Sequence, residues 1–202
     1  MTGPLRPPEI RCLQTTLSNG LDVLVRRQPG LPLVAVNLWY HVGSKDEERR
    51  QRGFAHLFEH LMFMGTERVP NSSFDKIMEA GGGANNASTG SDQTHYFSQG
   101  PAKLLPTLLW LDADRLEGLP KAMTKEKLDL QRNVVLNERR QNTENAPYGE
   151  SQVRLLELLY PHGHPYHMET IGRREDIEAA NVYDVKTFFY TYYVPNNATL
   201  VV

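Results

Sequence analysis

The chain has 202 residues, 40% of them hydrophobic, and carries 22 Lys and Arg against 24 Asp and Glu, a formal net charge of −2. This length and apolar content suffice for one compact domain with a substantial core. The near balance of charge gives no electrostatic reason to expect a nucleic acid or an anionic membrane as partner. We also expect no membrane span, because no apolar run approaches the roughly 20 residues that a span needs.

The sequence does not determine the compartment. Residues 1–9 are polar and rich in proline, without the basic start and apolar core of a secretory signal peptide. A longer precursor could still carry a leader, so for a bacterial protein both the periplasm and the cytoplasm stay open. Cys12, the only cysteine, cannot form an internal disulfide and is compatible with either redox environment.

Alternating and β-branched segments predict strands at both ends of the chain and in its middle. The first two flank Asn19-Gly20, the strongest short signal for a hairpin. The expected strands are 13–17, 21–25, 33–43, 86–90, 93–98 and 198–202. The last strand runs to the end of the sequence, so we expect that more protein once followed it.

Helical periodicity marks the segments between these strands. Residues 53–63 are apolar nearly all round, which predicts a buried helix, and Gly65 supplies a stop. Further helices are expected at 73–79, 101–117, 124–143, 149–159 and 174–193, with a loop at 161–166. Hairpin-linked strands combined with helices are typical of an α+β fold, with helices packed on one face of a mainly antiparallel sheet.

The 53–63 helix carries the clearest chemical signal. Successive helical residues turn by about 100°, so His56, Glu59 and His60 share one face. Two histidines four residues apart can bind one zinc ion, while the glutamate reaches a metal-bound water. Buried histidines that merely satisfy hydrogen bonds are the plain alternative. That alternative fits poorly, because three titratable groups on an apolar helix would each need a buried partner.

A catalytic zinc ion needs a third protein ligand. Glu138 is the leading candidate, because it lies on a helical stripe with Leu128, Gln131 and Val135 that should face the core. An ionised carboxylate is costly there unless a cation balances it. A salt bridge from Glu138 to an arginine is the structural alternative, and His95 is the rival ligand, although a half-buried strand histidine is more often structural.

A second histidine cluster lies near the C-terminal third of the chain. His162, His164 and His167 could bind another metal ion. Gly163 and Pro165 mark a surface turn, however, where histidines need no special role. We therefore expect the 53–63 helix, and not this cluster, to carry the chemistry.

Taken together, the residues resemble the family of pitrilysin, insulin-degrading enzyme and mitochondrial processing peptidase, zinc endopeptidases with the inverted motif H-x-x-E-H. The matching segments follow in order at 53–66, 82–89, 134–138, 147–149 and 195–200. The resemblance implies that His56, His60 and Glu138 bind one Zn²⁺ per chain. It also implies that Glu59 is the general base, which deprotonates the zinc-bound water for attack on the peptide carbonyl.

Two further features follow from the resemblance. Asn86, Ala87 and Ser88 look like the family's edge strand, which pairs with the backbone of an extended peptide substrate. Without the resemblance they would be an ordinary strand after a glycine turn. Gln131 stands where many members carry a glutamate that supports the metal site, and the exchange removes one negative charge from its surroundings.

The resemblance also implies that residues 1–202 are one zinc-binding domain, the first of two or more related domains that close on short or unfolded peptides. The second domain or subunit is expected to supply an arginine and a tyrosine to the substrate. Two other functions stay open: a non-catalytic or partly active peptide-binding subunit, and a small-molecule metallolyase. Retention of all four site residues argues against the first, and the glycine turn with its edge strand argues against the second.

Overall fold

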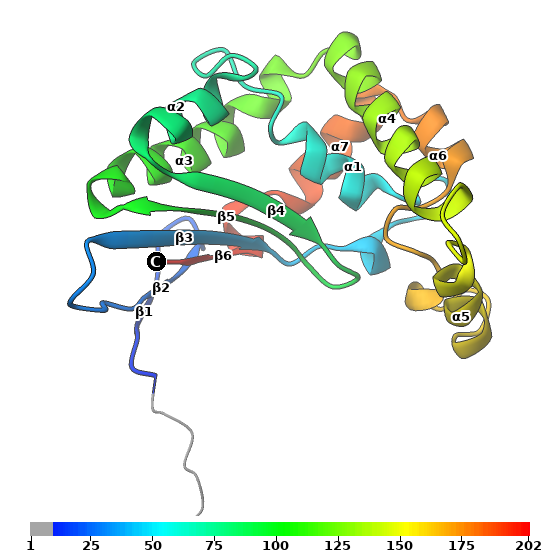
Figure 1. Ribbon diagram of the computed structural model, residues 1–202, viewed down its shortest axis with the longest axis horizontal. Coiled ribbons are helices and arrows are strands. Elements are labelled where there is room, and N and C mark those ends of the chain that lie inside the picture. Colours follow the sequence, from blue (N-terminus) through cyan, green and yellow to red (C-terminus); the bar gives the residue numbers. More distant parts are fainter. Residues whose placement is uncertain (1–9) are drawn as a thin grey trace, which may run out of the picture.

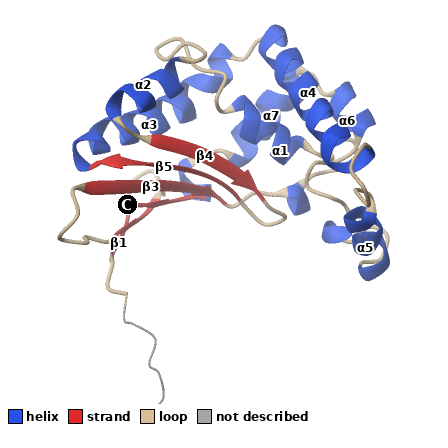
Figure 2. Ribbon diagram, viewed as in Figure 1, coloured by secondary structure: helices blue, strands red, loops and turns tan. Residues whose placement is uncertain are grey.

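The computed structural model describes residues 10–202, so the proline-rich start that lacks a signal-peptide pattern lies outside the described residues. Most α-helices of the described part lie on one face of a single sheet (Figures 1 and 2), which confirms the predicted α+β class. The strands are β1 Leu13–Thr16, β2 Asp22–Val25, β3 Leu33–Tyr40, β4 Ala84–Thr89, β5 Thr94–Pro101 and β6 Ala198–Val201. The α-helices are α1 Phe54–Leu61, α2 Ser73–Gly81, α3 Leu105–Ala122, α4 Lys125–Arg139, α5 Ser151–Leu159, α6 Arg174–Ala179 and α7 Val182–Tyr192.

The six strands are ordered β1-β2-β6-β3-β5-β4 across the sheet. All neighbouring pairs are antiparallel except β2 and β6, which run parallel. The final strand is therefore inserted between β2 and β3, and its pairing continues where the amide of Val202 donates to the carbonyl of Leu24 at 2.8 Å. This order leaves β1 and β4 as the two edges of the sheet.

Side chains of the central strands alternate between two environments. Val36, Leu38 and Tyr40 of β3 are buried on the face that the helices cover, together with Tyr96 of β5. The residues between them point to the opposite face, because successive side chains of a strand alternate. The helix-covered face is thus the one that builds the core.

Helix α1 lies at the centre of that core. Its residues Leu57, Phe58 and Leu61 are at most 1% exposed. Phe58 packs against the aromatic side of α7, with ring centroids 5.1 Å from Phe188 and 4.9 Å from Tyr193. Burying each such side chain stabilises the fold by about 1.5–3 kcal/mol, so α1 is a rigid support for the polar residues on its other face.

Two helical predictions differ from the structure. Residues 174–193 form α6 and α7 instead of one helix, because the side chain of Asn181 accepts a hydrogen bond from the amide of Asp184 at 3.0 Å and begins a new helix. The 101–117 helix begins later, after a 3₁₀ turn at Ala102–Leu104, and continues to Ala122. Among residues 10–202, no helix combines the length and apolar character needed to cross a membrane.

Candidate metal centre

The start of α1 is fixed by two residues. Gly53 precedes the helix with φ 98°, and a Cβ at this position would lie 2.6 Å from the carbonyl oxygen of Ile171, so only glycine fits without strain. The buried carboxyl of Glu47 accepts hydrogen bonds from the amides of Gly53 at 2.9 Å and Ala55 at 2.8 Å. These bonds satisfy amides that a helix N-terminus leaves free. Burial raises the pKa of Glu47 to about 8, against the effect of both hydrogen bonds.

Glu47 is not among the residues that the sequence predicts for the site. Its local signal is only an acidic residue shortly before the start of a helix, within a run of charged residues. The buried position comes from the 3₁₀ turn Ser44–Asp46, which ends at Glu47 and folds back on α1. Glu47 therefore positions the helix, although it does not reach the polar face of α1.

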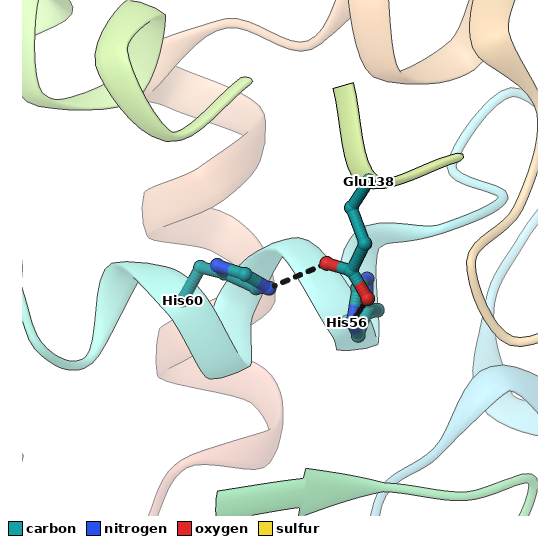
Figure 3. A group of neighbouring side chains, drawn as sticks. All are labelled: His56, His60 and Glu138. Atoms are coloured by element: carbon teal, nitrogen blue, oxygen red, sulfur yellow. Dashed lines mark ion pairs between the residues drawn. The ribbon is translucent and has the colours of Figure 1, made fainter. Parts of the chain in front are cut away.

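The polar face of α1 meets α4. His60 Nε2 lies 3.3 Å from Glu138 Oε2, and His56 Nε2 lies 3.7 Å from Glu138 Oε1. Figure 3 shows Glu138 reaching from α4 toward both imidazoles of α1. One ligand atom from each residue lies within 4.8 Å of the others. Within residues 10–202, no other set of three or more His, Cys, Asp or Glu residues meets this condition.

These three residues fit a zinc ion. A tetrahedral zinc ion with bonds of about 2.0–2.1 Å holds its ligand atoms roughly 3.3 Å apart, close to the two separations between the histidines and Glu138. Burial lowers the pKa of His56 to about 4, and the neighbouring His60 adds to this effect while Glu138 opposes it. The imidazole of His56 is therefore neutral at pH 7, the form that binds a metal.

Glu59 lies between the metal candidates and the edge strand β4. Its Oε2 accepts a hydrogen bond from the hydroxyl of Thr89 at 2.5 Å. Burial raises the pKa of Glu59, while the hydrogen bond from Thr89 acts in the opposite direction. A carboxyl group with a raised pKa accepts and returns a proton more readily near neutral pH. The arrangement can therefore serve general acid–base chemistry beside an extended strand.

The predicted substrate-binding residues lie on β4. This strand pairs with β5 on one side only, with Asn86 opposite Phe97 and Ser88 opposite His95. Ala87 is half-buried, and its amide donates to the side-chain oxygen of Asn86 at 2.8 Å. The outer backbone edge of β4 is thus a free edge of the sheet within the described part of the chain.

The remaining candidates lie away from the ligand atoms. Gln131 Nε2 donates to the sulfur of Met64 at 2.8 Å. Within residues 10–202 no hydrogen bond joins Gln131 to the two histidines or to Glu138. The rival His95 stacks on Trp39 with ring centroids 4.3 Å apart, on the sheet face opposite α1.

The histidine cluster of the 161–167 loop does not form a metal site. His162, His164 and His167 do not bring three ligand atoms within 4.8 Å of one another. Instead, His164 Nδ1 accepts a hydrogen bond from the amide of Tyr166 at 3.1 Å, and His167 Nδ1 donates to the carbonyl of Tyr160 at 2.8 Å. These side chains hold the loop together.

An open cleft of about 380 Å³ leads to His56 and Glu138, two of the candidate ligands. Its walls include Thr89 at the end of β4, Gly149 before α5, and residues 169–171. A Cβ at Gly149 would overlap the carbonyl of Thr143, so glycine lets this loop close the wall. A larger hollow of about 540 Å³ lies at the opposite end of β4 and has no titratable residue in its lining. Although this hollow is larger, its lining offers no acid, base or metal-binding side chain for a reaction.

Comparison with known proteins gives consistent matches. The family model "Insulinase (Peptidase family M16)" matches residues 22–162. Zinc protease PqqE of Helicobacter pylori is 37% identical over 188 residues, 93% of this chain and 42% of that protein. Mitochondrial-processing peptidase subunit beta of Lentinula edodes is 27% identical over 194 residues, 93% of this chain and 39% of that protein. The crystal structure of a protease from Helicobacter pylori superposes with a TM-score of 0.90 at 35% identity, covering 95% of this chain and 45% of that one. The chain spans less than half the length of these relatives.

Proposed function

The chain belongs to the insulinase family of peptidases, family M16, and on this premise we propose that it is the zinc-binding domain of a metalloendopeptidase that cleaves short or unfolded peptides. One observation carries the proposal. Two histidines from α1 and Glu138 from α4 bring their ligand atoms within 4.8 Å of one another, with Glu59 on the same face of α1. A non-catalytic peptide-binding subunit has no need of Glu59 in addition to the three candidate ligands.

His56, His60 and Glu138 would hold one zinc ion, and Glu59 would act as the general base. Zinc, when bound, acts as a Lewis acid that lowers the pKa of water and polarises a carbonyl group. The Glu59 carboxylate takes a proton from the attacking water and returns it to the amine of the leaving peptide. The hydroxyl of Thr89 orients this carboxylate through its 2.5 Å hydrogen bond.

The substrate would add a strand to the edge of the sheet. β4 is an edge strand that ends at Thr89, beside Glu59. A peptide paired with Asn86, Ala87 and Ser88 would replace the hydrogen bond between the Ala87 amide and the Asn86 side chain. Pairing through the main chain gives affinity with little demand on sequence, which suits a peptidase for unfolded substrates.

The substrate site needs a second component. The chain spans less than half the length of its relatives, and one of them is by name a subunit. We propose that a second related domain or subunit covers the cleft and supplies an arginine and a tyrosine to the substrate carbonyl. Such groups stabilise charge that develops in the transition state.

The test is cleavage of unstructured peptides by the full-length protein, followed by mass spectrometry. Glu59→Gln should keep its zinc and lose turnover by about 10²–10⁴-fold, because only the proton acceptor is removed. His95→Ala serves as the control and should keep both its zinc and its turnover. Turnover that survives in Glu59→Gln would refute the role of Glu59. A zinc-loaded wild-type protein that cleaves no peptide would instead identify a non-catalytic subunit.

A further inference from the structure

A basic hollow of about 400 Å³ is lined by residues just before and just after the 169–171 segment that lines the cleft beside His56 and Glu138. The arginines Arg49, Arg50, Arg52 and Arg173 line it, together with the three histidines of the 161–167 loop, and Asp176 is its one acidic lining residue. The hollow therefore has an excess of positive charge even with neutral histidines, although the whole chain has a net charge of −2. Four of the positive charges of the chain are thus gathered around one hollow.

The guanidinium groups of this hollow lack carboxylate partners. Within residues 10–202, no ion pair involves Arg49, Arg50, Arg52 or Arg173. Asp176 accepts a hydrogen bond from the backbone amide of Arg52 at 3.2 Å, so its carboxylate binds a backbone group and not a guanidinium group. Clustered positive charges repel one another and attract an anion.

Other arginines of the chain show the contrast. Arg68 pairs with Asp114 and Glu117, Arg154 with Glu157, and Arg174 with Glu178. Several arginines elsewhere in the chain are thus neutralised, including Arg174 directly beside Arg173. Arg26, Arg27 and Arg140 also lack an ion pair, but only the hollow gathers four such arginines of the described residues around one cavity.

The walls of the hollow are held in place before any ligand arrives. A Cβ at Gly172 would overlap the backbone of Arg52 and Gly53, so the two walls are in direct contact there. The rings of Tyr160 and His164 stack with centroids 4.6 Å apart. A site with fixed walls binds at a lower entropic cost.

The hollow lies in the direction in which a β4-paired peptide would continue. The cleft is lined by residues 169–171, and the hollow begins at the adjoining His167 and Met168. The turn after β4 contacts the same loop, since the hydroxyl of Tyr166 donates to Asp92 Oδ1 at 2.6 Å. In Figure 1 the arrow of β4 points toward the loops that join α5 to α6. A peptide that extends past Thr89 would therefore approach the hollow.

We propose that the basic hollow binds acidic side chains of the peptide substrate, on the stretch that extends past Thr89. This inference rests on the proposed peptidase function and adds to it a preference for carboxylates at one end of the substrate. Arginine is suited to this role because its fixed fork of donors matches a carboxylate. The volume of the hollow accommodates more than one acidic residue.

The test measures peptide binding separately from cleavage. Full-length, zinc-loaded Glu59→Gln protein is titrated against fluorescent peptides with a Glu-Glu-Glu or a Gln-Gln-Gln triplet, placed before or after a common central segment. At low salt, the acidic triplet should bind about tenfold more tightly on one side only, and added salt should reduce this preference. The double variant Arg49→Gln/Arg173→Gln should lose most of the preference. Both of its positions are exposed, so folding should persist, which circular dichroism checks.

Arg26→Gln/Arg27→Gln is the matched control, because it removes the same two charges from the exposed segment after β2 and should leave the preference intact. Equal affinity for both triplets, no binding of either, or a preference that survives in the double variant would overturn the inference. Cleavage of both peptides by the wild-type protein in those cases would leave the proposed function standing. An acidic preference without any cleavage would uphold the hollow and reject the peptidase.

Discussion

Replacing Gly53 by alanine should destabilise the protein through the first turn of α1, the helix that carries the proposed metal ligands. Two costs add at this position. Gly53 has φ 98°, and a residue with a Cβ in this left-handed conformation costs about 1 kcal/mol. The new Cβ would also lie 2.6 Å from the Ile171 carbonyl and 3.1 Å from the side chain of Ile177, an overlap that costs about 1–3 kcal/mol. The free energy of unfolding should therefore fall by about 2–4 kcal/mol, as measured by urea denaturation.

Gly30→Ala separates the two costs. Gly30 has φ 115°, but a Cβ there would meet no atom within 4 Å. This variant should lose only the conformational part, about 1 kcal/mol. If Gly53→Ala costs no more than Gly30→Ala, the close approach of residue 171 to the start of α1 is not tight, and α1 is not the rigid support proposed for the metal ligands.

Two more predictions concern residues that position helices. The pKa of Glu47 rises from 4.5 to about 8 on folding, so the folded state holds a proton that the unfolded state has lost, and stability should fall as pH rises from about 4.5 to 8. Glu47→Gln should flatten this slope in urea denaturation across that range, and an unchanged slope would assign the pH dependence to other groups. Asn181→Ala removes the cap of α7 and should cost about 1 kcal/mol, also by urea denaturation. A cost near zero would show that tertiary packing alone begins α7.

Local patterns explain why so much of the fold could be predicted. β-rich composition identifies β3, Asn19-Gly20 identifies the first hairpin, and the apolar run at 53–63 identifies α1, because each signal depends on neighbours in sequence. The parallel pairing of β2 with β6 carries no such signal, since the two strands are far apart in the sequence. The division between α6 and α7 was visible in principle, because Asn181 and Asp184 form a capping sequence.

The candidate site was likewise predictable from the sequence only in part. The three polar residues of α1 follow from helical spacing, but the approach of Glu138 depends on how α4 crosses α1, which only the tertiary structure gives. Gln131 is on the predicted stripe, yet it contacts Met64. The basic hollow could not be predicted from the sequence, because Arg49 and Arg173 line one cavity only through the close contact of two distant loops.

The most direct test of the central claim is the zinc content and zinc affinity of the full-length protein after replacement of Glu138. The wild-type protein should bind one zinc ion per chain, and Glu138→Gln should weaken binding by more than about 100-fold, because it removes a charged ligand. His95→Ala should bind zinc as the wild type does. One zinc per chain with unchanged affinity in Glu138→Gln would contradict the assignment of His56, His60 and Glu138 as the metal centre.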